Sequence, residues 1–110
     1  MNPTRLVLVG ASGRMGVQIL RLLPSTPAVR LCGAVASPHS GALGRDAGEH
    51  AGIGALGVAI SAALPPLLEQ ADVVVDFSAG AAAAATLAAC VAAQVPLLIG
   101  TTALPEALEA

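Results

Sequence analysis

Gly10, Gly13 and Gly16 stand three residues apart in the segment GASGRMG. In a dinucleotide-binding loop, the first glycine permits a tight turn, the second lets the main chain approach a pyrophosphate, and the third lets a helix lie close to the sheet. The N–H groups of Arg14 and Met15 would then point at the phosphates, with the positive end of the helix dipole behind them. The spacing therefore predicts a phosphate-binding loop, and its structural alternative is a plain glycine turn.

Ala36 stands where an NAD-selective site of this kind places Asp or Glu to bind the ribose 2′-OH. No acid is then present to repel a 2′-phosphate, while Ser37 and His39 supply no strong cation to bind one. The choice between NAD and NADP therefore stays open at this point. We expect His39 and His50 to be solvated histidines of a polar loop.

Two further segments could place polar groups beside the cofactor, DFS at residues 76–78 and GTT at residues 100–102. Asp76 closes an apolar run, and a carboxylate in that position needs hydrogen-bond partners. Thr101 and Thr102 offer two hydroxyls. The plain alternatives are a strand end followed by a helix cap, and ordinary loop residues.

The elements that must position these residues follow from hydrophobic spacing. Short apolar runs predict buried strands at residues 6–9, 29–36, 57–60, 73–76 and 96–99. Residues 37–56, rich in Gly, Ser, Asp and His, predict a long loop. Because strands alternate with helices, the sequence predicts an α/β fold with a Rossmann-like, doubly wound parallel sheet. Ligands of such sheets lie beyond the carboxyl ends of the strands, where the strand order reverses.

Helices are predicted at residues 14–24, at the proline pair 65–66 and on through 67–69 with proline in the first turn, and at about 80–93 with Ser78 as the N-cap. Residues 106–110 resemble the first turn of a further helix. We expect the sheet-facing stripes to be the apolar residues at helical spacing, namely Met15, Ile19, Leu22 and Leu23 in the first helix and Leu87, Cys90 and Val91 in the last.

Composition excludes several classes of function. The 110 residues are one domain's length, 55% are hydrophobic, and the net charge of -2 disfavours nucleic acid as a partner. The chain contains no lysine, so it cannot supply a Schiff base or a P-loop lysine. Cys32 and Cys90 lack metal-ligand spacing, so we expect buried free thiols, no metal site and a cytoplasmic location. The apolar stretch 77–105 is broken by Gly and Pro, which argues against a membrane span.

Four motifs follow one another along the chain: GASGRMG at 10–16, LGRDAGEHAG at 43–52, VDFS at 75–78 and IGTT at 99–102. Together they resemble the amino-terminal domain of the 4-hydroxy-tetrahydrodipicolinate (dihydrodipicolinate) reductase family, over nearly the whole chain. The resemblance implies a nicotinamide cofactor, NADP or NAD, with Phe77 and Ser78 at its nicotinamide end. The cofactor-binding residues expected on these grounds are Gly10, Ala11, Ser12, Gly13, Arg14, Met15, Ala36, Ser37, Phe77, Ser78, Gly100, Thr101 and Thr102.

The chain also departs from the family pattern. Ala36 and Ser37 replace an acid and a basic residue that the family often carries, residues 79–80 lack its usual proline, and Ala103 replaces a glycine. The family's catalytic histidine motif and general-acid lysine lie in a second, substrate-binding domain. We therefore expect residues 1–110 to be an NAD(P)-binding domain, truncated before that domain, with no catalytic residue and no activity alone.

The resemblance implies hydride transfer to a small unsaturated heterocyclic dicarboxylate in lysine and diaminopimelate biosynthesis. It also implies that the full-length protein is a homo-oligomer joined through the second domain, and that these 110 residues alone are a monomer. Two alternatives remain. One is the cofactor domain of another two-domain NAD(P) dehydrogenase, and the other is a module that senses NAD(P) without chemistry.

Overall fold

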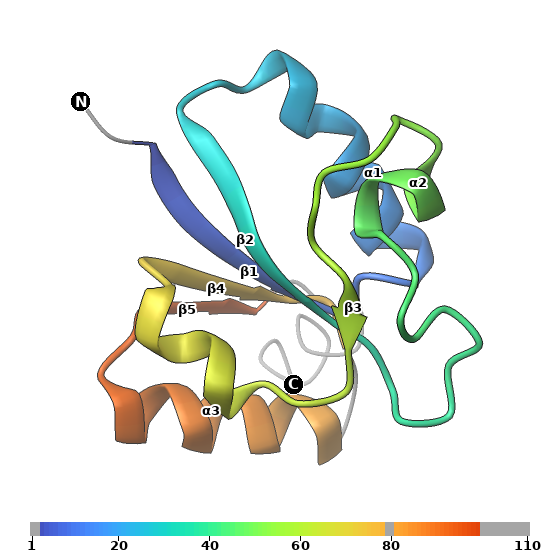
Figure 1. The fold of residues 1–110 in the computed structure, drawn as a ribbon. Helices are drawn as coiled ribbons and strands as arrows, with labels where there is room; N and C mark the ends of the chain where they lie inside the picture. Colours follow the sequence, from blue (N-terminus) through green and yellow to red (C-terminus); the bar gives the residue numbers. More distant parts are fainter. Residues whose placement is uncertain (1–2, 79–80, 100–110) are drawn as a thin grey trace, which may run out of the picture.

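The computed structural model describes residues 3–78 and 81–99. Its sheet has the strand order β3-β2-β1-β4-β5, and every paired strand is parallel (Figure 1). The strands are β1 (Thr4–Val9), β2 (Val29–Val35), β3 (Ile60–Ser61), β4 (Val73–Asp76) and β5 (Leu97–Ile99). The order reverses between β1 and β4, which confirms the predicted Rossmann-like, doubly wound sheet.

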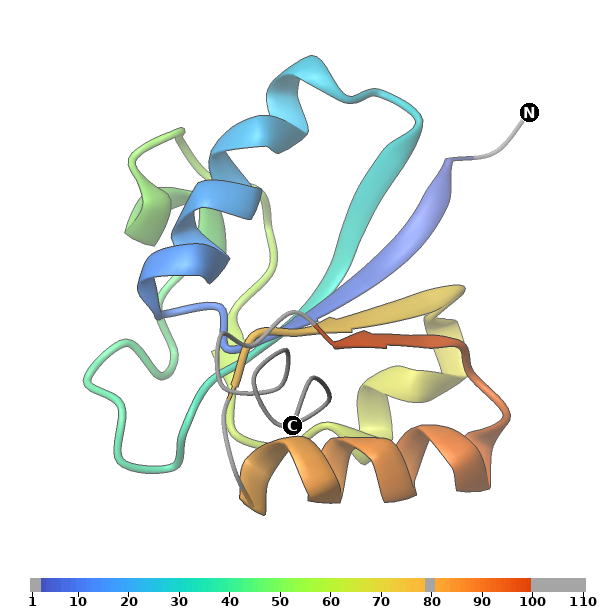
Figure 2. The same ribbon diagram turned by 180° about the vertical axis from the view of Figure 1, so that it is seen from behind.

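Helices cover both faces of this sheet. On one face lie α1 (Arg14–Leu22), which continues as the 3-10 turn η1 (Leu23–Ser25), and α2 (Ala47–Ala51). On the other lie the 3-10 helix η2 (Pro65–Gln70) and α3 (Ala81–Ala93), as Figures 1 and 2 show from opposite sides. The helix predicted at the proline pair is therefore present, as a 3-10 helix.

The central strand β1 supplies side chains to both layers. Leu6 and Leu8 belong to the buried cluster that contains Leu20 of α1, whereas Val7 and Val9 belong to the cluster that contains Cys90 of α3. Successive side chains of a strand point to opposite faces, so an unbroken apolar run is what a strand covered on both faces requires. The predicted buried strand at residues 6–9 is confirmed and extends back to Thr4.

The stripe predicted for the first helix is rotated in the structure. Met15 is 46% exposed and Leu22 is 58% exposed, while the buried residues of α1 are Gly16 and Leu20. Gly16 sets this rotation, because it lies directly beneath the main chain of Gly10. The prediction was right for Ile19 and Leu23, which pack against the core cluster, and wrong for Met15 and Leu22. It relied on large side chains and ignored Gly16, which marks the face of α1 that packs most closely on the glycine loop.

The stripe predicted for the last helix is also mostly wrong. Cys90 is buried as expected, but Leu87 is 49% exposed and Val91 is 68% exposed. Small residues occupy the inner face instead, with Ala83 and Thr86 buried beside the sheet. The alanine-rich sequence of α3 carries little periodic signal. The predicted cap by Ser78 depends on residues 79–80, which lie outside the described part of the chain, as do residues 106–110.

A missed helix and a shifted strand share one cause, the carboxylate of Asp46. Its oxygens accept main-chain N–H bonds from Glu49 at 3.0 Å, Leu56 at 2.9 Å, Gly57 at 2.8 Å and Val58 at 3.1 Å. The first bond caps α2, which lies inside the predicted loop 37–56. The other three remove residues 56–58 from sheet pairing, so β3 begins at residue 60 and not at residue 57.

These four bonds lower the pKa of Asp46 from an ordinary 3.8 to about 2. The ionised form is thus favoured by folding, and its stabilisation is complete above pH 3.8 and lost as the pH falls through about 2. We expect Asp46→Asn to lower the urea-unfolding midpoint at pH 6. The difference between the two proteins should shrink steadily from pH 4 to pH 2.

Far-ultraviolet circular dichroism at a series of pH values measures this difference. Glu69→Gln is the matched control, because no described residue donates a hydrogen bond to the exposed Glu69 carboxylate. A difference for Asp46→Asn that stays constant down to pH 2 would contradict the assignment.

Among the described residues, no helix is long and apolar enough to cross a membrane.

Candidate functional site

The glycine loop leaves β1 at the carboxyl edge of the sheet and turns at once toward β2. Gly10 has a φ of +84°, a conformation that side chains disfavour. The N–H groups of Gly10 and Ala11 both donate to the Val35 carbonyl, at 2.8 and 3.0 Å. The loop is therefore fixed to the end of β2, as the predicted tight turn requires.

The three glycines have separate roles in this loop. A Cβ at Gly10 would lie 2.9 Å from main-chain atoms of Phe77 and Ser78, so the loop packs directly on the segment after β4. A Cβ at Gly16 would lie 2.2 Å from the Gly10 carbonyl oxygen, so α1 packs directly under the loop. Among the described residues, a Cβ at Gly13 would meet only that same oxygen, at 3.5 Å, so they leave the outer side of Gly13 open.

Gly13 is also the N-cap of α1, with φ −80° and ψ 174°. No side chain in the described part of the chain caps α1, and no acidic residue stands in its first turn. The N–H groups of a helix's first turn have no partners within the helix, and the helix dipole adds positive potential there. The start of α1 can therefore accept a phosphate from the solvent side, in agreement with the predicted loop.

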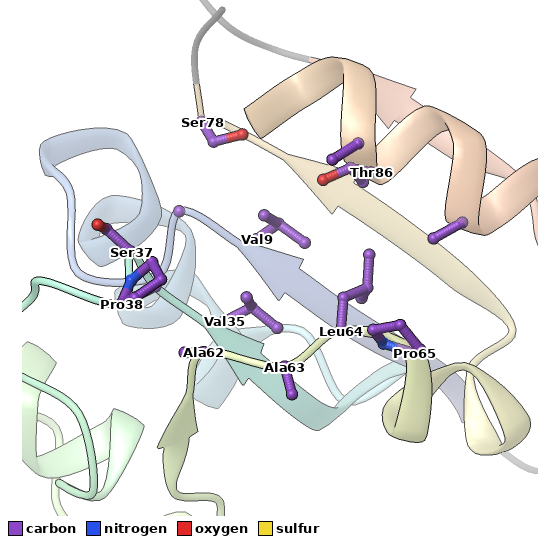
Figure 3. Close-up of a pocket in the computed structure, with 14 residues that line it drawn as sticks. Val9, Val35, Ser37, Pro38, Ala62, Ala63, Leu64, Pro65, Ser78 and Thr86 are labelled. Carbon is purple, nitrogen blue, oxygen red and sulfur yellow. The ribbon is translucent and has the colours of Figure 1, made fainter. Parts of the chain in front are cut away.

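A cavity of about 410 Å³ adjoins this loop on the α3 side of the sheet, and Figure 3 shows its lining. The wall is mostly apolar, with side chains from the ends of β1 and β2, the segment after β3, and α3. Its residues are Val9, Gly10, Val35, Ala36, Ser37, Pro38, Ala62, Ala63, Leu64, Pro65, Ser78, Ala85, Thr86 and Ala89. An apolar slot of this size beside a glycine turn suits the flat ring of a nucleotide.

The predicted site residues separate into groups. Gly10, Ala36, Ser37 and Ser78 meet around the cavity. Ala11 is buried beneath the loop. Ser12, Gly13, Arg14 and Met15 form the loop and helix start outside the cavity wall. Phe77 packs against the core cluster on the α1 side, away from the cavity. Gly100, Thr101 and Thr102 lie outside the described residues.

Sequence reasoning missed the part of the wall after β3. Residues 62–65 reach the cavity because β3 is parallel to β2 and ends at the same edge of the sheet. That rule of topology could have indicated them, as it indicated the segments after β1 and β4. The inner face of α3 was missed because its cavity-lining residues are mostly alanines.

The loop after β2 contacts the glycine loop through a hydrogen bond between two hydroxyl groups. The Ser40 hydroxyl donates to the Ser12 hydroxyl at 3.4 Å, and the Ser37 hydroxyl accepts the His39 N–H at 3.2 Å. Arg14 is exposed at the start of α1 and is the arginine nearest in sequence to this group. The expected ribose end therefore presents hydroxyls, with no carboxylate at position 36.

The cysteines show no sign of a redox or metal role. Cys90 is buried and Cys32 is half-buried, and burial is the main cause that raises the pKa of each thiol. A raised thiol pKa means less of the reactive thiolate. Within residues 3–78 and 81–99, no group of three or more His, Cys, Asp and Glu residues could hold a metal ion.

Comparison with known sequences gives one consistent result. A family model described as "Dihydrodipicolinate reductase, N-terminus" matches residues 4–110. Proteins named 4-hydroxy-tetrahydrodipicolinate reductase from Anaeromyxobacter dehalogenans, Alkalilimnicola ehrlichii and Acinetobacter baumannii are 48%, 43% and 41% identical to this chain over 90%, 94% and 93% of its length. The chain spans only 37%, 39% and 37% of those relatives.

Solved structures show the same fold. An amine dehydrogenase from Mycobacterium smegmatis superimposes with a TM-score of 0.75 at 30% identity, over 87% of this chain and 29% of that one. A protein called RSP, solved with beta-NAD+ and operator DNA, gives a TM-score of 0.64 at 13% identity, over 98% of this chain and 54% of that one. The second likeness is one of fold alone.

Proposed function

Because the chain belongs to the dihydrodipicolinate reductase family, whose amino-terminal part it matches, we propose that it is the NAD(P)H-binding domain of a reductase in lysine and diaminopimelate biosynthesis. The whole protein would transfer a hydride from NADPH or NADH to a small unsaturated heterocyclic dicarboxylate in the cytoplasm. The observation that carries the cofactor assignment is the glycine turn between β1 and α1, which opens directly beside an apolar cavity.

The residues of the site fit a dinucleotide in two parts. The pyrophosphate would lie on the main chain of Gly13 and the N–H groups that begin α1, where no side chain intervenes. A ring with its ribose would enter the cavity between Ala36 and Thr86. The bound cofactor supplies the hydride, and these residues bind and orient it. Gly100, Thr101 and Thr102 remain proposed contacts on the ground of family resemblance.

We propose further that these 110 residues bind the cofactor without reducing a substrate. Reduction of the substrate needs a positioned general acid, and a dicarboxylate needs cations to hold it. Asp76 is buried, the guanidinium of Arg14 cannot release its proton, and His39 belongs to the ribose-side loop. The substrate contacts and the oligomer interface would therefore belong to the larger remainder of the relatives, and the present chain alone would be a monomer.

Position 36 gives the test of both the function and the cofactor preference. Ala36 lines the cavity, so a longer side chain there would enter it. We expect the unmodified chain to bind NADPH at least as tightly as NADH. Ala36→Glu should weaken NADPH binding about tenfold or more, because its carboxylate repels the 2′-phosphate, and should favour NADH by accepting from the 2′-OH.

Paired titrations of the two cofactors measure these affinities, by calorimetry or by the fluorescence of the reduced nicotinamide, since the chain has no Tyr or Trp. Ala36→Gln is the control, with similar bulk and no charge, and it should not reverse the preference. The same preparations should oxidise no NADPH when substrate is added. Binding of neither cofactor would contradict the proposed function, and measurable turnover would contradict the proposed inactivity of these 110 residues alone.

A further inference from the structure

Asp76 is a buried acidic residue to which the proposed function gives no task. It ends β4 and is 0% exposed, although a carboxyl group is costly to bury away from water. Its side chain faces the α3 layer, because Val74, two residues earlier on the same face, packs in the cluster that contains Cys90. Burial, and to a smaller extent the nearby Asp76 charge, raises the pKa of the Cys90 thiol.

One carboxylate oxygen of Asp76 holds Ser78 by two bonds. Asp76 Oδ1 accepts the main-chain N–H of Ser78 at 2.6 Å, and it also accepts the proton of the Ser78 hydroxyl. The intervening residue is fixed as well, because the Phe77 N–H donates to the Val9 carbonyl at 2.8 Å. The segment after β4 is therefore held on the surface against which Gly10 packs.

The other oxygen, Oδ2, is buried and has no hydrogen-bond partner within residues 3–78 and 81–99. The ion pair found in that part of the chain joins Arg5 and Asp72, so no arginine there neutralises Asp76. An unpaired buried acceptor costs stability. The presence of an acid at this position is therefore better explained by what Oδ1 does to Ser78 than by a contribution to folding.

The hydroxyl of Ser78 has one proton, and it donates that proton in a hydrogen bond to Asp76 Oδ1. Oδ1 already acts as an acceptor toward the Ser78 N–H, and it acts in the same way toward the hydroxyl. A hydroxyl whose proton is engaged keeps only its acceptor lone pairs for another partner. Ser78 lines the cavity at the end of β4, beside the start of α3 (Figure 3). It therefore faces the cavity as an acceptor.

We propose that Asp76 is a positioning residue that makes Ser78 a fixed hydrogen-bond acceptor for an amino group of the bound dinucleotide. The proposal rests on the proposed function and names the chemistry of one contact within it. A phosphate carries no proton to donate and would be repelled by the acceptor, so it does not lie at this point, and an N–H donor fits the acceptor. A dinucleotide carries two such groups, the adenine 6-amino group and the nicotinamide carboxamide.

Two cofactor analogues separate these sources. In the hypoxanthine analogue the adenine amino group is replaced by oxygen, and in the 3-acetylpyridine analogue the carboxamide amino group is replaced by methyl. We expect the unmodified chain to bind one of them about tenfold more weakly than the parent cofactor, since a buried polar group then loses its partner. The analogue that is rejected identifies which amino group Ser78 accepts.

Variants of Asp76 and Ser78 test whether these residues cause the discrimination between the parent cofactor and the rejected analogue. Ser78→Ala should bring the ratio of analogue to parent affinity close to one. Asp76→Asn should retain most of it, because the amide oxygen can accept the same two bonds from Ser78. Asp76→Ala should relax it, because the freed hydroxyl can then donate as well as accept. A role for Asp76 in stability alone would lower the unfolding midpoint and leave the ratio unchanged.

The outcomes are distinct. If the parent cofactors fail to bind, the proposed function is wrong. If they bind and neither analogue is rejected, or if Ser78→Ala keeps the full discrimination, the role assigned to Ser78 is wrong. If Asp76→Ala fails to fold, the comparison of Ser78→Ala with Asp76→Asn still tests the proposal. We expect Ser78→Ala to lose the discrimination between analogue and parent, and Asp76→Asn to retain it.

Discussion

Gly16→Ala should lower the free energy of unfolding by about 3 kcal/mol or more, despite placing alanine in a helix. Helix propensity alone would favour alanine over glycine by about 1 kcal/mol. The added Cβ, however, would lie 2.2 Å from the Gly10 carbonyl oxygen and 2.8 Å from the Ala11 Cα. Both are main-chain atoms of the glycine loop, so α1 must move away from that loop. The clash therefore outweighs the gain in propensity.

Thermal unfolding followed by circular dichroism measures this loss, and we expect a fall in Tm of roughly 10 °C or more for a domain of this size. Gly41→Ala is the matched control, because a Cβ at Gly41 meets nothing within 4 Å and the residue has no positive φ. The control should stay within about 0.5 kcal/mol of the parent. An unchanged Tm for Gly16→Ala would refute the close packing of α1 on the loop.

Gly13→Val should give a different pattern, with cofactor affinity falling more than stability. The Gly13 φ of −80° suits any side chain, and its Cβ would have only one contact, at 3.5 Å. The new isopropyl group would occupy the place of the pyrophosphate and push it from the N–H groups of α1. We expect a loss on the order of 2 kcal/mol or more in cofactor binding, or about 30-fold in Kd.

The Kd is measured by titration with NADPH, alongside an unfolding curve for the same protein. Ala92→Val, on an exposed position of α3, adds two methyl groups away from the loop and should leave Kd unchanged. Unaltered binding by Gly13→Val would show that the pyrophosphate does not lie on this loop. A collapse in stability would show that the outer side of Gly13 is not open.

The secondary structure and the turns could be predicted from the sequence where the local sequence pattern agrees with the tertiary contacts. Residues 73–76 form a strand with the predicted bounds, because an apolar run buried between β1 and β5 has no competing partner for its main chain. The glycine loop could be predicted for a similar reason. Gly10 and Gly16 lie so close to other main-chain atoms that few other residue types fit there.

The predictions were wrong where a side chain forms hydrogen bonds with main-chain groups that a strand would use. They were also wrong where a small residue, and not a large apolar one, lies on the buried face of a helix. Asp46 accepts hydrogen bonds from the N–H groups of residues 56–58, so β3 begins later in the sequence than predicted. The capping of α2 by Asp46 was visible in the sequence, because an Asp stands three residues before Glu49. The helix stripes were wrong at Met15, Leu22, Leu87 and Val91, because Gly16 and Thr86 face inward where larger apolar residues were expected. The cavity requires small residues on α3, and its shape is not encoded by hydrophobic spacing.

The central place of β1 has a consequence for the order in which the chain can fold. Its pairing with β2 joins residues about 25 positions apart, such as Thr4 and Val29, whereas its pairing with β4 joins Leu6 to Val73. The longer loop closure carries the greater entropic cost and produces slow, non-local folding. During synthesis from the amino terminus, the α1 side of β1 can be covered first. Its α3 side, with Val7 and Val9, stays open to water or to a chaperone until residues 73–90 have emerged from the ribosome.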